Sequence, residues 1–325
     1  MHDVFRQRLA GMLRSALGAA ITDALSDPSV VEVMVNPDGT LWVERHGSGR
    51  EKTNVVLTTD VTERVIRLVA SHIGVSCDRG HPIVSAELPE SGERFEGVLP
   101  PISTAPCFAI RKPAGKLYRL YDYVASGVLR AEQAQTLRAA VQTRKNVLIA
   151  GGTGSGKTTL ANALLAEIAA SGERIILIED TRELSCDADD WIALRTKPGV
   201  AALGCLVRST LRLRPDRIIV GEVRGGEALD MLKAWNTGHP GGLATLHANS
   251  AEAALSRLEQ LIGEAAMTVP RSLIAEAIDI VVFIAGRGEA RRVESILEVT
   301  GLAPDGFRLR DLTPVSFGSQ ERKAS

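Results

Sequence analysis

The sequence predicts an α/β protein in which a domain with a parallel-rich sheet follows a smaller α+β domain. From Lys145 onward, apolar strand-like runs alternate with helical stretches, a pattern typical of a parallel sheet flanked by helices. Earlier in the chain the apolar runs are short and are separated by Pro, Gly and Ser. The length of 325 residues also favours two cores over one. We therefore expect an N-terminal domain at residues 1–113, a linker at 114–123 and the sheet domain at 124–325.

The elements of the N-terminal domain follow from its apolar spacing. Helical spacing marks residues 3–25 and 59–73 as amphipathic helices, the first of which packs on its own domain or docks on a membrane or partner. Between them, "VEVMVNPDGTLWVER" has two alternating runs around an Asn-Pro-Asp-Gly turn, which predicts a β-hairpin. Three strand-like pieces follow: "PIVSAEL", "RFEGVLPPI" and "CFAIRKP".

Composition narrows the class of protein. The formal net charge of −1 argues against a basic nucleic-acid coat. The four cysteines are scattered with no Cys-x-x-Cys pair, which argues against a structural metal site and against a disulfide framework. The charged N-terminus and the shortness of the apolar stretches argue against a secretory signal and a membrane span. We expect a cytoplasmic protein that is at most peripheral on a membrane.

The strongest feature is a glycine-rich loop in "NVLIAGGTGSGKTTLANALL", between an apolar strand and a predicted helix. Glycines let the backbone curl so that its N–H groups point at phosphate oxygens, and the helix N-terminus adds its dipole. Lys157 supplies a charge for the β- and γ-phosphates, and the Thr158 hydroxyl suits Mg²⁺. Because the guanine-specifying Asn-Lys-x-Asp pattern is absent, the expected cofactors are ATP and Mg²⁺. The expected binding residues are Gly151, Gly152, Thr153, Gly154, Ser155, Gly156, Lys157, Thr158 and Thr159.

Two further apolar strands end in acidic residues. "RIILIED" ends in Glu179 and Asp180, and "DRIIVGE" ends in Glu222. In an open parallel sheet these strand ends face the ligand crevice, so both glutamates are expected near the loop. Hydrolysis needs one carboxylate to position water and another to hold Mg²⁺. The expected metal-binding residues are Thr158 and Glu222. Gly221 stands where an aspartate is usual, so the division of roles between the glutamates stays open.

With these segments in place, the chain resembles the secretion ATPases of type II and type IV systems. Four of their boxes stand here in order: the loop at 151–159, "IEDTREL", "LRLRPDRIIVGEVRGGEA" and "TGHPGGLATLHANS". The loop segment and "LKAWNTGHPGGLATLHANSAEAAL" look most like the TrbB-type ATPases of plasmid conjugal transfer. The resemblance spans roughly residues 30–300, and the paired-cysteine module of the longer pilus-assembly enzymes is absent.

The resemblance implies a RecA-like P-loop domain and a homo-oligomeric, hexameric ring that binds ATP between its two domains. It implies that Glu179 is the catalytic carboxylate, that Glu222 supports metal or water, and that His247 senses the γ-phosphate. An arginine of the N-terminal domain would reach the phosphates, and Arg94 and Arg111 both occupy comparable places. The implied role is the motor of a conjugation or type IV secretion apparatus, working with inner-membrane components at the cytoplasmic face.

Three alternatives stay open. A type IV pilus retraction or assembly ATPase shares all four boxes, a nucleotide-gated scaffold would bind without turnover, and a RecA-like helicase would be stimulated by DNA. Four arginines invite the nucleic-acid interpretation: Arg208, Arg212, Arg214 and Arg217. The net charge argues against direct nucleic-acid binding. We expect instead that Arg208 and Arg212, four apart on one helix face, meet a neighbouring subunit.

Overall fold

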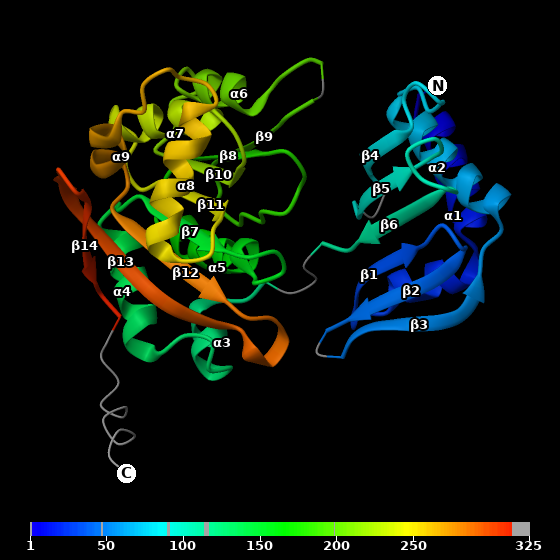
Figure 1. Ribbon diagram of the computed structural model, residues 1–325, viewed down its shortest axis with the longest axis horizontal. Coiled ribbons are helices and arrows are strands. Elements are labelled where there is room, and N and C mark those ends of the chain that lie inside the picture. The colour runs from blue at the N-terminus through cyan, green and yellow to red at the C-terminus, as the bar shows by residue number, and fades with distance from the viewer. Residues whose placement is uncertain (1, 47, 90–91, 114–116, 198, 314–325) are drawn as a thin grey trace, which may run out of the picture. The chain divides into compact units, whose positions relative to one another are not determined.

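In the computed structural model the chain divides into two compact units, residues 1–115 and 116–325. In Figure 1 the first unit runs from blue to teal and the second from green to red. The structure describes residues 2–46, 48–89, 92–113, 117–197 and 199–313. The helix α3 (Leu120–Ala125) begins within the range 114–123 that was predicted as a linker. Leu120 and Tyr123 are buried in the core of the second unit, since they pack on its sheet.

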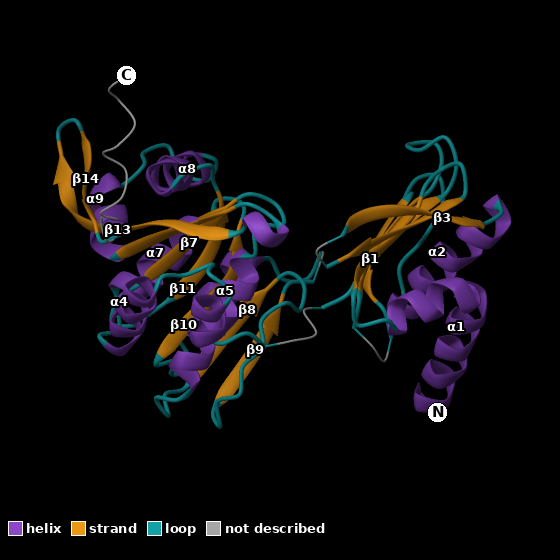
Figure 2. Cartoon of the chain, turned by 90° about the horizontal axis from the view of Figure 1, so that it is seen from below, coloured by secondary structure: helices purple, strands orange, loops and turns teal. Residues whose placement is uncertain are grey.

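The first unit is an antiparallel sheet with helices on one face. Its elements are α1 (His2–Ser26), β1 (Val30–Val35), β2 (Thr40–Arg45), β3 (Gly49–Val56), α2 (Thr59–Ile73), β4 (Ile83–Glu87), β5 (Arg94–Val98) and β6 (Cys107–Arg111). In the described residues the strand order is β3-β2-β1-β6-β5-β4. The predicted hairpin is β1–β2, with Val35 opposite Leu41, and α2 matches the helix predicted at 59–73. Figure 2 shows α1 and α2 on the same side of the sheet.

The first helix differs from the single helix expected over residues 3–25. At Gly18 the backbone has φ 73° and ψ 169°, so α1 consists of two helical segments that meet at a kink. Leu13, Leu17 and Ile21 are buried in the core of the first unit, which shows that this stripe packs on its own domain. Of the helices in the described part of the chain, none has an apolar stretch long enough to cross a bilayer.

The second unit is built on a mostly parallel sheet, which confirms the predicted α/β class. Its remaining elements are α4 (Ala131–Gln142), β7 (Val147–Gly151), α5 (Lys157–Ala169), β8 (Ile175–Glu179), β9 (Trp191–Arg195), α6 (Leu203–Thr210), β10 (Arg217–Val223), α7 (Glu227–Asn236), β11 (Leu243–His247), α8 (Ala251–Gly263), α9 (Arg271–Ala277), β12 (Ile280–Ala285), a 3₁₀ turn at Gly288–Ala290, β13 (Arg292–Ala303) and β14 (Gly306–Asp311). Within the described residues the order is β14-β13-β12-β7-β11-β10-β8-β9. The strands from β12 to β9 are parallel, and β13 and β14 add an antiparallel edge.

Helices cover both faces of this sheet, which explains why its strands read as continuous apolar runs. Leu148 and Ala150 of β7 face one core, to which α6, α7, α8 and α9 contribute. Val147 and Ile149 face the other core, to which α3, α4 and α5 contribute. Every residue of β7 is buried, so the strand that carries the glycine-rich loop is fixed from both sides.

Asn146 secures the base of that strand. Its side-chain Nδ2 donates to the Ala277 carbonyl at 2.8 Å, and its Oδ1 accepts the Gly242 amide at 2.8 Å. The residue is only 4% exposed. One buried amide side chain therefore ties the start of β7 to the starts of its neighbours β11 and β12.

Replacing Asn146 with Ala should lower the free energy of unfolding by about 2–4 kcal/mol, because two buried main-chain groups lose their partners. Urea unfolding followed by tryptophan fluorescence measures the change. Asn236→Ala is the matched control, since that side chain is exposed and its Nδ2 donates to Glu276 at the surface. A loss below about 1 kcal/mol for Asn146→Ala would show that water replaces both bonds.

Candidate nucleotide-binding site

The glycine-rich loop leaves the end of β7 and enters α5 at Lys157. Gly154 and Gly156 adopt φ values of 74° and 95°, which only glycine tolerates readily. At Gly151 a Cβ atom would lie 2.4 Å from the Ile284 carbonyl oxygen, so no larger residue fits. Gly156 contributes no side chain to cap α5, and helix N-termini attract anions through their first amides. This backbone forms the cradle expected for phosphate.

The side chain of Lys157 folds back over the loop. It is 6% exposed, and its Nζ donates to the carbonyl oxygens of Gly151 and Gly152, each at 3.1 Å. The same Nζ lies 3.2 Å from Nδ1 of His247. The ammonium group is thus held at the loop by main-chain oxygens and an imidazole, as expected of a phosphate-binding lysine.

His247 lies next to the loop because β11 is parallel to β7 and pairs His247 with Gly151. Its Nε2 is 2.8 Å from Oε1 of Glu222. A neutral ring protonated at Nε2 satisfies both neighbours, donating to Glu222 and accepting from Lys157. Burial, together with the charges of Lys157 and Arg224, lowers the pKa of His247, and Glu222 opposes this shift. A continuous chain of contacts therefore joins Glu222, His247 and Lys157.

Glu222 uses its second carboxylate oxygen to bind Arg224. Nε of Arg224 donates to Oε2 of Glu222 at 2.6 Å, and its guanidinium also lies 3.7 Å from Asp180. Arg224 consequently links the ends of β10 and β8. Glu222 is close to the loop, as the strand-end argument predicted, but both of its oxygens contact side chains.

Glu179 is at the end of β8 as predicted, yet its contacts are with the main chain. Its Oε1 accepts the amides of Glu183 at 2.9 Å and Leu184 at 2.7 Å, and the residue is 3% exposed. Burial raises the pKa of Glu179, and the two amides partly offset that shift. Such a carboxylate holds the loop that follows β8 in place.

Glu183, which the sequence argument did not single out, is the carboxylate that meets the P-loop. The Thr158 hydroxyl donates to its Oε2 at 3.1 Å. Asn162 of α5 fixes this segment by donating to the Glu183 carbonyl and accepting the Ser185 amide, each at 2.9 Å. The second glutamate of "IEDTREL" was the available signal, but it lies four residues beyond the end of the strand.

The site offers the donors that Mg²⁺ prefers. The Thr158 hydroxyl and the Glu183 carboxylate are hard oxygen groups on one side of the loop. Mg²⁺ beside a nucleotide takes one or two protein ligands and completes its shell with phosphate and water. These side chains fit a metal that arrives with a triphosphate.

Arg94 and Arg111 lie together in the first unit. They are directly opposite each other on β5 and β6, and Glu32 of β1 is the next residue across the sheet. Burial raises the pKa of Glu32, and the charges of Arg111 and Arg94 oppose that shift. Their neighbours along the strands, Phe95 and Ile110, face the core, so this charged row is on the face away from the helices.

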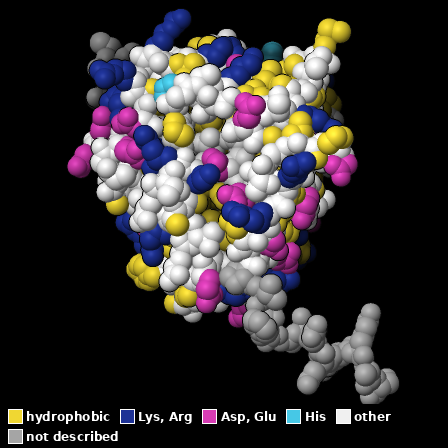
Figure 3. Space-filling model, turned by 90° about the vertical axis from the view of Figure 1, so that its left-hand side faces the viewer, with side chains coloured by type: hydrophobic (Ala, Val, Ile, Leu, Met, Phe, Trp, Pro, Cys, Tyr) yellow, Lys and Arg dark blue, Asp and Glu magenta, His cyan; other side chains and the backbone are white. Residues whose placement is uncertain are grey.

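The other arginines have local partners. Arg217 is 2% exposed and bonds to Glu173 and the Gly241 carbonyl, so it is a structural residue. The prediction that Arg208 and Arg212 share a helix face is wrong, because α6 ends at Thr210. On the face of the molecule shown in Figure 3, Lys and Arg side chains are interspersed with Asp and Glu.

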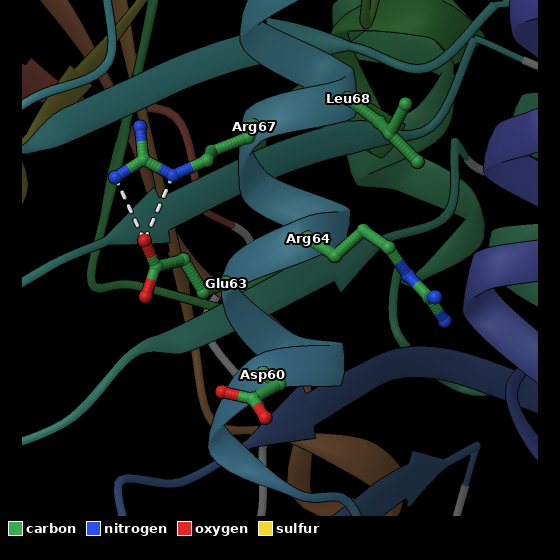
Figure 4. A pocket seen from close by; sticks show the side chains of 5 residues that line it. All are labelled: Asp60, Glu63, Arg64, Arg67 and Leu68. Carbon is green, nitrogen blue, oxygen red and sulfur yellow. Dashed lines mark hydrogen bonds and ion pairs between the residues drawn. The ribbon is translucent and has the colours of Figure 1, made fainter.

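A separate hollow lies along α2 in the first unit. It has a volume of about 430 Å³ and is lined by Asp60, Glu63, Arg64, Arg67 and Leu68. Arg67 pairs with Glu63 at 2.7 Å, while Arg64 points the other way (Figure 4). The glycine-rich loop belongs to the second unit, so this hollow is not the phosphate cradle.

The chain belongs to the type II/IV secretion system protein family, whose family model matches residues 15–286. It is 49% identical over 296 residues to the conjugal transfer protein TrbB of Rhizobium radiobacter, covering 90% of this chain and 91% of that protein. It is 38% identical over 321 residues to the type IV secretion system protein PtlH of Bordetella pertussis, covering 86% and 93%. The X-ray structure of the Legionella pneumophila ATPase DotB shares the fold at a TM-score of 0.60 and 19% identity, covering 84% and 77%. The family resemblance predicted from the sequence is confirmed.

His247 should titrate below its ordinary pKa of 6.5 in the nucleotide-free protein, because burial and Lys157 disfavour the imidazolium. Lys157→Met removes a positive charge and should raise this pKa, whereas Glu222→Gln removes a negative charge and should lower it further. NMR titration of the imidazole resonances measures all three proteins. A Glu222→Gln pKa above that of the wild type would contradict the contact chain, and Glu132→Gln on the exposed start of α4 is the control.

Proposed function

We propose that this chain is the ATP-hydrolysing motor of a type IV secretion or conjugal transfer system, powering pilus assembly or substrate transfer as a hexameric ring. One observation carries the ATPase assignment. A carboxylate near the end of β10 and another in the loop after β8 converge on one phosphate loop, Glu222 through His247 to Lys157 and Glu183 directly to Thr158. The likeness to TrbB and PtlH supports the secretion setting.

Each residue has a distinct task in this proposal. The loop amides and the Lys157 ammonium bind the β- and γ-phosphates of ATP. Thr158 and Glu222 would hold the Mg²⁺ that neutralises phosphate charge when the nucleotide is bound. Glu183 orients the attacking water, and Glu179 positions Glu183 through its main-chain amide. This assignment moves the catalytic carboxylate from Glu179 to Glu183, because Glu179 is buried and its Oε1 accepts two main-chain amides, whereas Glu183 contacts Thr158.

The ring and its surroundings complete the proposal. Arg94 or Arg111 reaches the phosphates at an interface between domains or subunits. The two arginines lie opposite each other on β5 and β6, and Glu32 and Glu87 are the next residues across the sheet on either side. His247 senses the γ-phosphate through its contact with Lys157. The motor is cytoplasmic and peripheral on the inner membrane, where inner-membrane components of the apparatus are its partners.

Two substitutions separate binding from turnover. Lys157→Ala should abolish measurable ATP hydrolysis with the fold retained, because the loop loses its only side-chain ammonium. Glu183→Gln should still bind ATP while kcat falls by about 10²–10⁴-fold, the usual contribution of a general base. Steady-state phosphate release and calorimetry measure the two effects, with Glu132→Gln as an exposed control. Wild-type turnover by Lys157→Ala would end the proposal.

The same measurements separate the alternative functions. ATP binding by the wild type without Mg²⁺-dependent phosphate release would favour a nucleotide-gated scaffold. Stimulation of turnover by single-stranded DNA would favour a helicase, and a pilin gene cluster beside the gene would favour a pilus motor. Sizing the protein with and without ATP tests the hexameric ring.

A further inference from the structure

The turn between β12 and β13 places two arginines on the glycine-rich loop. Nε of Arg287 donates to the Thr153 carbonyl oxygen at 3.0 Å. A terminal nitrogen of Arg291 donates to the next carbonyl oxygen, that of Gly154, at 3.3 Å. These contacts join residues more than 130 positions apart in the sequence. They involve two successive peptide groups, those from Thr153 to Ser155, which we call the crest of the loop.

Holding these oxygens fixes the orientation of the amides that follow them. A trans peptide is planar and points its oxygen and its N–H to opposite sides. Arg287 therefore sets the plane that carries the Gly154 amide, and Arg291 sets the plane that carries the Ser155 amide. In loops of this kind the amides make the anion cradle while the carbonyl oxygens point outward. The Ser155 amide also closes the crest turn on the Gly152 oxygen at 3.3 Å.

The turn is built to bring the arginines to this place. β12 is parallel to β7 and pairs Phe283 with Ala150, so the turn leaves the sheet beside the loop. Gly286 has φ 77°, and a Cβ there would lie 2.1 Å from the Ala290 carbonyl oxygen, so the tight turn requires glycine. A Cβ at Gly156 would come within 3.0 Å of Nε of Arg291. The turn and the loop are therefore packed against each other.

The partners of these arginines differ from those of most arginines nearby. In the described part of the chain, neither Arg287 nor Arg291 is paired with a carboxylate within 4.0 Å. Nε of Arg291 is buried there without a hydrogen-bond partner. The next residue, Arg292, instead bonds to Glu294 and to the Ala290 carbonyl. Two positive charges are thus added behind the crest of an anion-binding loop.

We propose that Arg287 and Arg291 are positioning residues that brace the crest of the phosphate loop and thereby set its affinity for the triphosphate. For the identity of the ligand this inference rests on the proposed ATPase function. A pre-formed loop binds the ground state and the transition state alike. Loss of the brace should therefore raise KM and Kd more than it lowers kcat.

The first test needs no nucleotide. The hydrogen exchange rates of the Ser155 amide, which donates to the Gly152 oxygen, should rise about fivefold or more in the Arg287→Gln/Arg291→Gln double variant, because the loop opens more readily. Arg292→Gln, on the same turn but without a contact to the loop, should leave these rates unchanged. Equal exchange in the double variant and the wild type would overturn the brace, whatever the protein hydrolyses.

The second test measures function. The double variant should raise the Kd for ATP, and KM, by about tenfold, with kcat within about threefold of the wild type. A loss confined to kcat would overturn the proposal. So would wild-type behaviour of Arg287→Lys/Arg291→Lys, because charge alone would then be sufficient. If the wild type binds no ATP but amide exchange in the loop is still faster in the double variant, the proposed ATPase function is wrong and the positioning role of the two arginines is retained.

Discussion

Parallel pairing of β11 with β7 is the constraint on which the site depends. The pairing places His247 beside Gly151, within reach of the Lys157 ammonium. On the other side of β11, the penultimate residue of β10 is Glu222, which bonds to the same imidazole. Since neighbouring parallel strands end at one edge of a sheet, three strand ends supply the chain of contacts without any loop having to reach across. Asn146 preserves that alignment from the opposite end of the strands.

The departure from the usual acidic residue before Glu222 has a steric reason. A Cβ at Gly221 would lie 3.2 Å from Cγ of Glu179, so a side chain there would compete with the buried glutamate for the same space. Glu179 uses that space to bind the amides of Glu183 and Leu184. β10 therefore has glycine instead of an acid at position 221, and Glu179 of β8 holds the loop that places Glu183 against Thr158. Glycine at position 221 and the carboxylate of Glu183 at Thr158 are therefore linked, because both depend on the buried side chain of Glu179.

Sequence patterns predicted what is local and missed what depends on tertiary contacts. The hairpin, α2 and the glycine-rich loop follow from turn chemistry and periodicity within a few residues. The position of Glu183 could not be predicted, because it depends on Asn162 of a different element. The burial of Arg217 was equally hidden, since its sequence neighbours look like an exposed basic cluster. The same limit applies to Arg287, whose partner Thr153 lies on a different strand connection.

Under the proposed function, charge placement would let a chain of net charge −1 attract a triphosphate without presenting a general basic surface. Away from the loop, Arg208, Arg217 and Arg310 are each paired with a carboxylate, so their fields largely cancel at the surface. At the loop, Arg287 and Arg291 bond to main-chain oxygens, which carry only partial charges. Arg287 and Arg291 therefore bring positive charge to the place where glycine amides converge. A compact polyanion is attracted to such a point, whereas a long nucleic acid needs a continuous basic track.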